Sequence, residues 1–197
     1  MYNTSDTEKT AMRVVSGFAR GHKLICLEGE SVRPTSDRVK EAIFSALSER
    51  LYGSRFLDMF SGSGAIGIEA LSRGASYVAF VEESSRHTDI IKKNLDHVSK
   101  AIPDANYNLF EKDALESIET LKSLDLQFDI IFLDPPYELG LWKDVLTGIQ
   151  KSELLSEDGI IILEISKDEK EPVLPHFNIA KKKFYGSTAV YYMEIYE

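Results

Sequence analysis

The chain has 197 residues, of which 43% are hydrophobic and 28% are charged, as in an ordinary soluble domain. Its single cysteine excludes a disulfide framework, and no apolar run reaches the roughly 20 residues of a membrane span. The formal charge of −9 argues against a general attraction to nucleic acid, although six Lys and Arg oppose three Asp and Glu between Met12 and Lys40. The composition predicts a cytoplasmic protein with a basic amino-terminal end and an acidic body.

The first 40 residues predict a small extension in front of the main domain. Residues 1–11 are polar and lack periodicity, so we expect a disordered leader or a tag there, with Met12 as an alternative start. The strand-like pieces RVV and KLICL flank the turn-forming SGFARGH, which predicts a hairpin within residues 12–34. A helix with one apolar face follows RPTS, where Thr35 or Ser36 can cap its amino end.

From Arg55 onward, strand and helix patterns alternate, which predicts a doubly wound α/β sheet with parallel strands over residues 35–197. The last two strands follow each other without a helix between them and predict an antiparallel hairpin that closes the sheet. The expected strands are 56–59, 77–81, 107–110, 130–133, 159–165, 177–185 and 190–196. The expected helices between the parallel strands are 64–73, 84–99, 114–122 and 140–150.

A glycine-rich loop, DMFSGSGAIG, follows the first of these strands and fits the G-x-G-x-x-G pattern of adenosine-containing cofactors. Glu82 ends the next strand, where an acid would hold the two ribose hydroxyls. Asp58 favours S-adenosylmethionine over NAD, because a carboxylate repels a pyrophosphate but attracts an ammonium and a sulfonium. Each such charge pair contributes on the order of 4 kcal/mol before desolvation. Asp113 is a candidate for the adenine amino group, with helix capping as the alternative.

The segment FDIIFLDPPY combines a buried strand with an acid, two prolines and a tyrosine at its carboxyl end. That edge of an open α/β sheet is where ligands bind. Asp134 and a backbone carbonyl fixed by Pro135 and Pro136 could hold the two N–H groups of an exocyclic amine, with its lone pair aimed at a methyl donor. Tyr137 could stack on the base, which contributes roughly 1–3 kcal/mol. No metal or covalent cysteine is needed, and Cys26 is far along the chain from these motifs.

Five segments together resemble a known family, and they span Met12 to Glu197: MRVVSGFARGHKL, VRPTSDRVKEAIFSAL, DMFSGSGAIGIEALSRGA, FLDPPY and YGSTAVYYMEIY. The sequence is similar to the RsmD-type bacterial methyltransferases, which modify the N2 amine of a guanine in the 16S RNA of the small ribosomal subunit. The DPPY motif is shared with adenine-N6 methylases, whereas RPTSDRVKEAIF joined to DMFSGSGAIGIEALSRGA is specific.

The resemblance implies a Rossmann-like class I methyltransferase with a seven-stranded sheet, S-adenosylmethionine as donor and 16S ribosomal RNA, within the assembling small subunit, as partner. From the residues we expect no metal and no membrane contact, and we expect a monomer. The donor would contact Asp58, Phe60, Ser61, Gly62, Ser63, Gly64, Glu82, Asp113 and Ala114. The guanine amine would contact Asp134, Pro135, Pro136 and Tyr137. The RNA would contact Arg13, Arg20, Lys23, Arg33, Thr35, Arg38 and Lys40.

Three alternatives stay open from the residues. An adenine-N6 methylase would use the same DPPY segment. An NAD-dependent oxidoreductase would explain the glycine loop and Glu82, but would leave DPPY without a role. A noncatalytic RNA-binding assembly factor would explain the basic end, but not the cofactor loop. The four histidines, His22, His87, His97 and His176, have no metal-ligand spacing, and we expect them at the surface.

Overall fold

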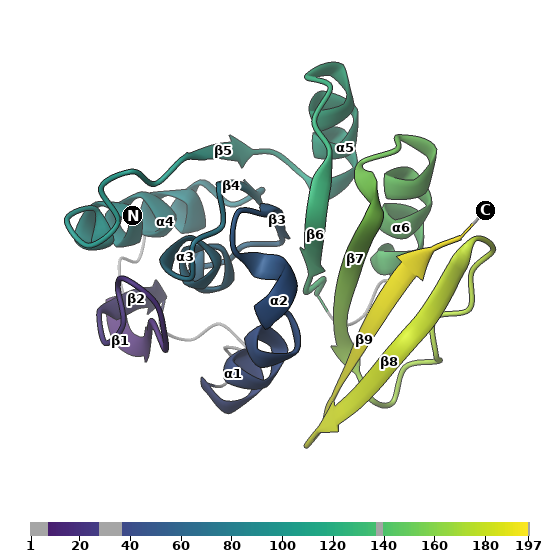
Figure 1. Cartoon of the computed structure of the whole chain (residues 1–197), viewed down its shortest axis with the longest axis horizontal. Helices are drawn as coiled ribbons and strands as arrows, with labels where there is room; N and C mark the ends of the chain where they lie inside the picture. Colours follow the sequence, from purple (N-terminus) through teal and green to yellow (C-terminus); the bar gives the residue numbers. More distant parts are fainter. Residues whose placement is uncertain (1–7, 28–36, 137–139, 197) are drawn as a thin grey trace, which may run out of the picture.

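A computed structural model describes residues 8–27, 37–136 and 140–196, which form a small two-stranded sheet and a seven-stranded sheet with helices on both faces (Figure 1). The strands are β1 (Glu8–Arg13), β2 (Lys23–Leu27), β3 (Arg55–Met59), β4 (Tyr77–Glu82), β5 (Tyr107–Glu111), β6 (Phe128–Leu133), β7 (Leu155–Ser166), β8 (Phe177–Tyr185) and β9 (Thr188–Ile195). The helices are α1 (Asp37–Ala46), α2 (Ser48–Leu51), α3 (Ala65–Ser72), α4 (Ser85–Val98), α5 (Ala114–Ser123) and α6 (Leu141–Lys151).

The large sheet has the strand order β5-β4-β3-β6-β7-β9-β8. The first five strands of this order are parallel, and β9 runs antiparallel to both β7 and β8. This confirms the predicted doubly wound sheet and its antiparallel hairpin. Strands β4 and β5 lie on one side of β3, and β6 and β7 lie on the other side. The direction of the strand order therefore switches between β3 and β6. Ligands bind at such switch points in open α/β sheets.

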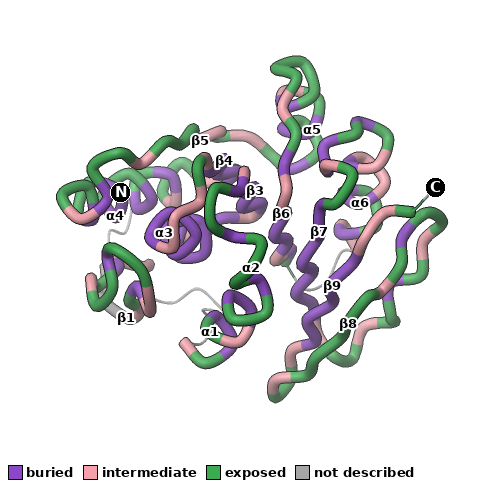
Figure 2. Tube along the Cα trace, viewed as in Figure 1, coloured by how far each residue is buried: buried purple, intermediate pink, exposed green. Residues whose placement is uncertain are grey.

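Apolar side chains on both faces bury the central strands, as the continuous hydrophobic runs predicted. Helices α1 to α4 cover one face, which we call the α1–α4 face, and α5 and α6 cover the other. The side chains of β3 alternate between these two faces: Phe56 packs toward α1–α4, and Leu57 packs toward α5 and α6. Figure 2 shows that β6 and β7 are mostly buried, whereas the outer strand β8, beyond β9, is mostly exposed. Within the described ranges, no helix is long and apolar enough to cross a membrane.

Several expected boundaries differ from the structure. Strand β1 begins at Glu8, so the disordered leader is wrong for residues 8–11, which lie in this strand. Residues 8–10 pair with β2, and Ala11 lies at a register shift. The RVV segment is not a strand beyond Arg13, because the chain turns there to dock on α3. Strand β7 begins at Leu155, whereas the sequence predicted a start at Gly159. Leu155 already pairs with Phe128 of β6, and a register shift separates this pair from the pair of Ile130 and Ile160. Residues 1–7 lie outside the described part of the chain.

Helix α3 packs unusually close to β4, and Gly67 makes this approach possible. A Cβ atom at Gly67 would lie 2.2 Å from Cε1 of Phe80, which is buried in the sheet. No rigid ring can yield that much without moving the helix. The third glycine of the loop motif therefore sets the distance between the glycine loop and the sheet.

We expect Gly67→Ala to lower the free energy of unfolding by about 1–3 kcal/mol, because the added methyl overpacks the contact with Phe80. Gly148→Ala is the matched control in a helix: the atom nearest to its Cβ would be the terminal methyl of Ile118 at 2.8 Å, which can turn away. Urea unfolding of both variants measures the difference. Equal midpoints for Gly67→Ala and the wild type would show that the close approach is not a constraint.

Candidate active site

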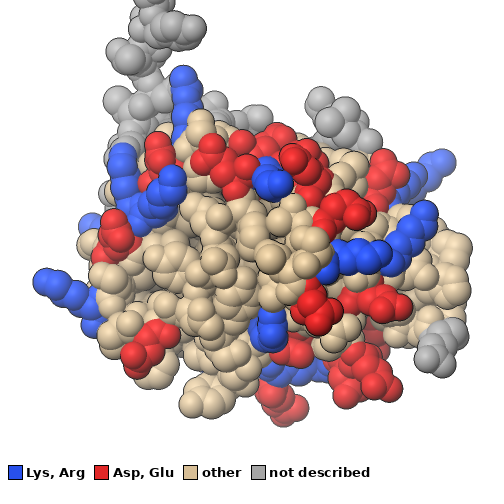
Figure 3. All heavy atoms as spheres, turned by 90° about the horizontal axis from the view of Figure 1, so that it is seen from above, with Lys and Arg blue, Asp and Glu red and all other residues tan. Residues whose placement is uncertain are grey.

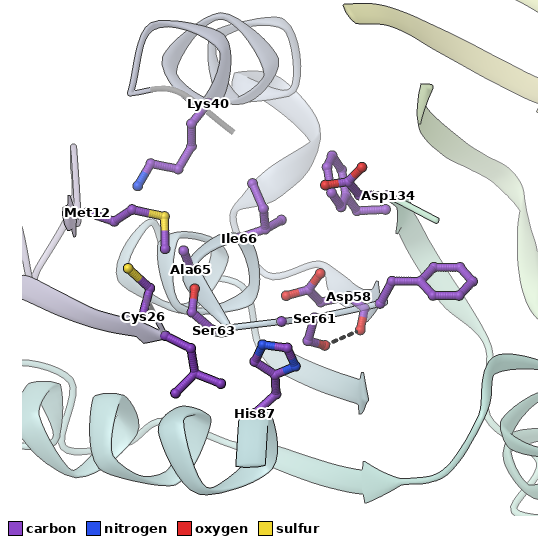
Figure 4. A pocket seen from close by; sticks show the side chains of 14 residues that line it. Met12, Cys26, Lys40, Asp58, Ser61, Ser63, Ala65, Ile66, His87 and Asp134 are labelled. Atoms are coloured by element: carbon purple, nitrogen blue, oxygen red, sulfur yellow. Dashed lines mark hydrogen bonds between the residues drawn. The ribbon is translucent and has the colours of Figure 1, made fainter. Parts of the chain in front are cut away.

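Asp58 and Asp134 line one pocket at the carboxyl edge of the sheet, where β3 and β6 lie side by side. The register pairs Asp58 with Phe132, so Asp134 follows two residues later on the same face. Figure 4 shows these two acids on one side of the pocket and Lys40, Met12 and Cys26 on the other. The described lining is Met12, Cys26, Leu27, Lys40, Asp58, Phe60, Ser61, Gly62, Ser63, Ala65, Ile66, His87, Phe132 and Asp134.

The carboxylate of Asp58 is almost completely buried, with an exposure of 1%. Its Oδ2 accepts a hydrogen bond of 2.9 Å from the backbone N–H of Gly67 in the first turn of α3. Burial raises the pKa of Asp58 from 3.8 to about 7, the hydrogen bond from Gly67 opposes this, and the charge of Glu82 adds to it. No ion pair to Asp58 is found among the described residues. A buried carboxylate without a cation suits a ligand that brings a positive charge.

The glycine loop is held to the sheet by Ser61. Its hydroxyl donates to the carbonyl of Asp58 at 2.6 Å, the bond dashed in Figure 4, and accepts from the N–H of Val81 at 3.1 Å. Phe60 has a positive φ of 66°, an uncommon conformation for a residue with a side chain. Gly64 has a φ of 77° directly before α3. Phe60, Ser61, Gly62 and Ser63 line the pocket as predicted for a cofactor loop, although contact with a donor stays a prediction.

Glu82 ends β4 and reaches back to the glycine loop. Its Oε2 accepts from the N–H of Gly62 at 2.8 Å, and its Oε1 accepts from the N–H of Ser84 at 2.9 Å. Burial raises the pKa of Glu82, but the hydrogen bonds from His87, Ser84 and Gly62 outweigh it, so the pKa lies below its ordinary value. Glu82 thus stays ionised beside the loop, as an acceptor of ribose hydroxyls requires.

His87 was expected at the surface, and that expectation is wrong. Its side chain is 16% exposed, its Nδ1 lies 3.4 Å from Oε1 of Glu82, and it lines the pocket. The available signal was its position in the first turn of the helix after Glu82, since that turn must lie over the same sheet edge as the glycine loop.

Asp113 caps helix α5. Its Oδ1 accepts from the N–H groups of Leu115 at 2.9 Å and Glu116 at 3.0 Å, which is the capping alternative. Asp113 is exposed, Ala114 is buried, and neither lines the pocket. Their contact with the adenine therefore stays a prediction.

The DPPY segment begins directly after β6. Burial raises the pKa of Asp134 well above its ordinary value, and the nearby charges of Glu164 and Asp58 add to this. Glu164, which the sequence did not single out, lies on the neighbouring strand β7, one residue beyond the pair of Leu133 and Leu163. Pro135 is buried and Pro136 is exposed, whereas Tyr137 lies outside the described residues.

The amino-terminal hairpin forms one wall of the pocket through Met12, Cys26 and Leu27. Cys26 therefore lies at the site, despite its distance from the motifs along the chain. Asn94 of α4 fixes this wall: its Oδ1 accepts from the N–H of Ile25 at 2.8 Å, and its Nδ2 donates to the carbonyls of Ile25 and Ser63, both at 2.9 Å. One buried side chain thus joins β2 to the glycine loop.

Lys40 was expected to contact RNA, but the structure corrects this prediction. Its side chain is 1% exposed, and its Nζ donates to the carbonyl of Arg13 at 2.5 Å and lies 3.6 Å from Oε2 of Glu69. Burial lowers the pKa of Lys40, although Glu69 and Asp37 partly oppose this. Lys40 therefore joins α1, the hairpin and α3 inside the protein.

The remaining candidates for RNA contact stand at the surface or outside the described ranges. Arg20, Lys23 and Arg38 are exposed. Arg13 is exposed too, but its Nε donates to Oδ2 of Asp37 at 3.0 Å. The other two candidates, Arg33 and Thr35, lie outside the described residues. RNA contact by these residues stays a prediction, and no cluster of three potential metal ligands occurs in the described part of the chain.

The raised pKa of Asp58 predicts how the stability of the ligand-free chain depends on pH. The folded state keeps a proton that the unfolded state has lost, so the contribution of Asp58 falls as pH rises from about 4 to about 7. Its full size is about 4 kcal/mol. We expect Asp58→Asn to flatten this decline in urea unfolding curves. Replacement of the exposed Asp104 by Asn should leave the decline unchanged, and an equally steep decline in Asp58→Asn would contradict the assignment.

Comparison with known proteins shows the family to which the chain belongs. Residues 12–194 match the family model described as Conserved hypothetical protein 95. The chain is 36% identical to the putative rRNA methyltransferase YlbH of Bacillus subtilis, over 91% of this chain and 96% of the relative. It is 34% identical to ribosomal RNA small subunit methyltransferase D of Haemophilus influenzae, over 90% of this chain and 91% of the relative.

Solved structures share the fold. The putative methyltransferase yhhF from Escherichia coli superposes with a TM-score of 0.79 at 26% identity, covering 96% of this chain and 98% of that one. A putative methyltransferase complexed with SAH, SMU.776, has a TM-score of 0.66 at 17% identity, covering 89% of this chain and 54% of that one, which shows the fold alone. The chain therefore belongs to the Conserved hypothetical protein 95 family, the RsmD-type methyltransferases that its motifs resemble, and has the fold of S-adenosylmethionine-dependent methyltransferases.

Proposed function

We propose that this protein transfers a methyl group from S-adenosylmethionine to the N2 amine of a guanine in the 16S RNA of the small ribosomal subunit. The observation that carries the proposal is the placement of Asp58 and Asp134 on one pocket at the β3–β6 switch point. Asp58 suits a cationic donor, and Asp134 suits an amine that must lose a proton. The relatives named as rRNA methyltransferases support RNA as the substrate.

The residues around the glycine loop fit S-adenosylmethionine, which supplies a methyl group on a positively charged sulfur. Asp58 is buried without a cation among the described residues and would hold the positive end of the donor. Glu82 is ionised at the end of β4 and would accept the ribose hydroxyls. An NAD pyrophosphate would instead place its negative charge near Asp58, so the site disfavours the oxidoreductase alternative.

Asp134 would hold the amine and take up its proton. When the guanine nitrogen bonds to the methyl carbon, the carbon–sulfur electron pair leaves with the sulfur and the nitrogen becomes positively charged. Asp134 can accept the N–H bond before transfer and the proton afterwards, because burial and Glu164 make its carboxylate more basic. Pro135 and Pro136 limit the conformations of the carbonyl that would accept the second N–H.

The choice of guanine N2 over adenine N6 rests on the resemblance of the segments RPTSDRVKEAIF and DMFSGSGAIGIEALSRGA to the RsmD-type family. Asp134 and the DPPY segment would serve either exocyclic amine, so the product nucleoside decides between the two bases.

The direct test is methyl transfer from labelled S-adenosylmethionine to small subunits that lack the modification, with the product nucleoside identified by mass spectrometry. We expect N2-methylguanosine. We expect Asp134→Ala to reduce the rate by roughly 10²- to 10⁴-fold, while S-adenosylhomocysteine still binds.

Three results would contradict the proposal. If the product were N6-methyladenosine, the proposed site would stand, but guanine as the substrate base would be wrong. An Asp134→Ala rate equal to that of the wild type would remove the proposed role of Asp134. An absence of S-adenosylhomocysteine binding by the wild type would overturn the donor.

A further inference from the structure

The outer strand β8 carries three consecutive lysines, although the chain as a whole has a formal charge of −9. All three are exposed. Among the described strands, β8 pairs only with β9, so it forms an edge of the large sheet (Figure 1). Lysines on an edge strand commonly protect it from pairing with another chain. That role requires charge on the strand, but not on a particular face.

The three lysines are divided between the two faces of the sheet. Lys181 is paired with Tyr192 and Lys183 with Val190, and both partners belong to the core of the α1–α4 face. Lys182 is paired with Tyr191, which belongs to the core of the opposite face. Lys181 and Lys183 therefore stand on the face that also carries Asp58 and Asp134.

The register brings these lysines level with the substrate pocket. Val190, the partner of Lys183, also pairs with Glu164 of β7, and Glu164 neighbours Asp134 at the end of β6. From β6 to β8 there are three strand spacings, or about 14 Å. A nucleotide whose base enters the pocket would have neighbouring phosphates within that range.

The interactions of the three lysines also differ between the two faces of the sheet. Lys182 forms an ion pair with Glu171, so its charge is locally balanced. Nζ of Lys181 lies 5.4 Å from the ring centroid of Tyr192, and Lys183 has no ion pair among the described residues. Figure 3 shows the molecule from above, where acidic and basic side chains are mixed. Lys181 and Lys183 are therefore exposed cations without an ion pair among the described residues, whereas Glu194 on the same face is paired with Arg50 at 3.6 Å.

We propose that Lys181 and Lys183 form a phosphate-binding strip that holds the RNA backbone next to the extruded guanine. This rests on the proposed function, since it takes RNA as the substrate. Backbone contacts of this kind position the nucleic acid and make binding depend on salt. The strip would complement the amino-terminal hairpin, so that the RNA is held on both sides of the pocket.

The test compares Lys181→Gln/Lys183→Gln with Lys182→Gln, the matched control on the opposite face of the same strand. The dissociation constant for unmodified small subunits is measured between 0.05 and 0.3 M salt, values of the order used to resolve counterion release. We expect the double variant to bind roughly ten- to thirtyfold more weakly at low salt. The slope of log K against log salt should decrease in magnitude by about 1.4, for two phosphate contacts. Affinity for S-adenosylhomocysteine and kcat at saturating subunits should be unchanged.

The strip would be overturned by unchanged binding and slope in the double variant. It would also be overturned by the same loss of affinity per lysine removed in Lys182→Gln, which would indicate an effect of net charge alone. Failure of the proposed function is recognised separately, because the wild-type protein would then transfer no methyl group to the subunits at any salt concentration. Weaker S-adenosylhomocysteine binding by the double variant would also count against the strip, since its lysines lie on the far side of β7 and β9 from the glycine loop.

Discussion

The site depends on the burial of carboxylates at the switch point between β3 and β6. Asp58 and Asp134 follow apolar runs that are covered on both faces, so their charges are costly in the ligand-free fold, and burial raises the pKa of each. The hydrogen bond from Gly67 offsets part of this cost at Asp58. A cationic donor would offset the remaining cost of burying the carboxylates. This unfavourable burial in the ligand-free fold would therefore favour donor binding and catalysis.

The amino-terminal hairpin is built into this site rather than attached to it. Glu69 of α3 accepts from the N–H groups of Val15 at 2.7 Å and Ser16 at 2.9 Å, and Ser72 accepts from that of Ala19 at 2.9 Å. Together with Asn94, these buried side chains replace the backbone pairs that the hairpin lacks with the main sheet. A hairpin held in this way can carry RNA contacts on its outer side and form a pocket wall on its inner side.

The sequence predicted the large sheet and both acids because these are local signals: apolar runs, a glycine motif and prolines that end a strand. It missed His87, Cys26 and Asn94 as parts of the site, since their roles arise from contacts between elements far apart in the chain. Lys40 was misassigned for the same reason, because its partner Glu69 is on another helix. Its residue type alone predicts that Lys40 is exposed. Only the packing of α1 on α3 shows that its side chain is buried.

In the proposed function, one pocket would bind the donor at Asp58 and present its methyl group to an amine at Asp134. A crystal structure of the chain with S-adenosylhomocysteine tests this most directly. We predict that the amino group of the ligand contacts Asp58, its ribose lies against Glu82 and its sulfur faces Asp134. A ligand bound elsewhere, or a sulfur turned away from Asp134, would contradict the account.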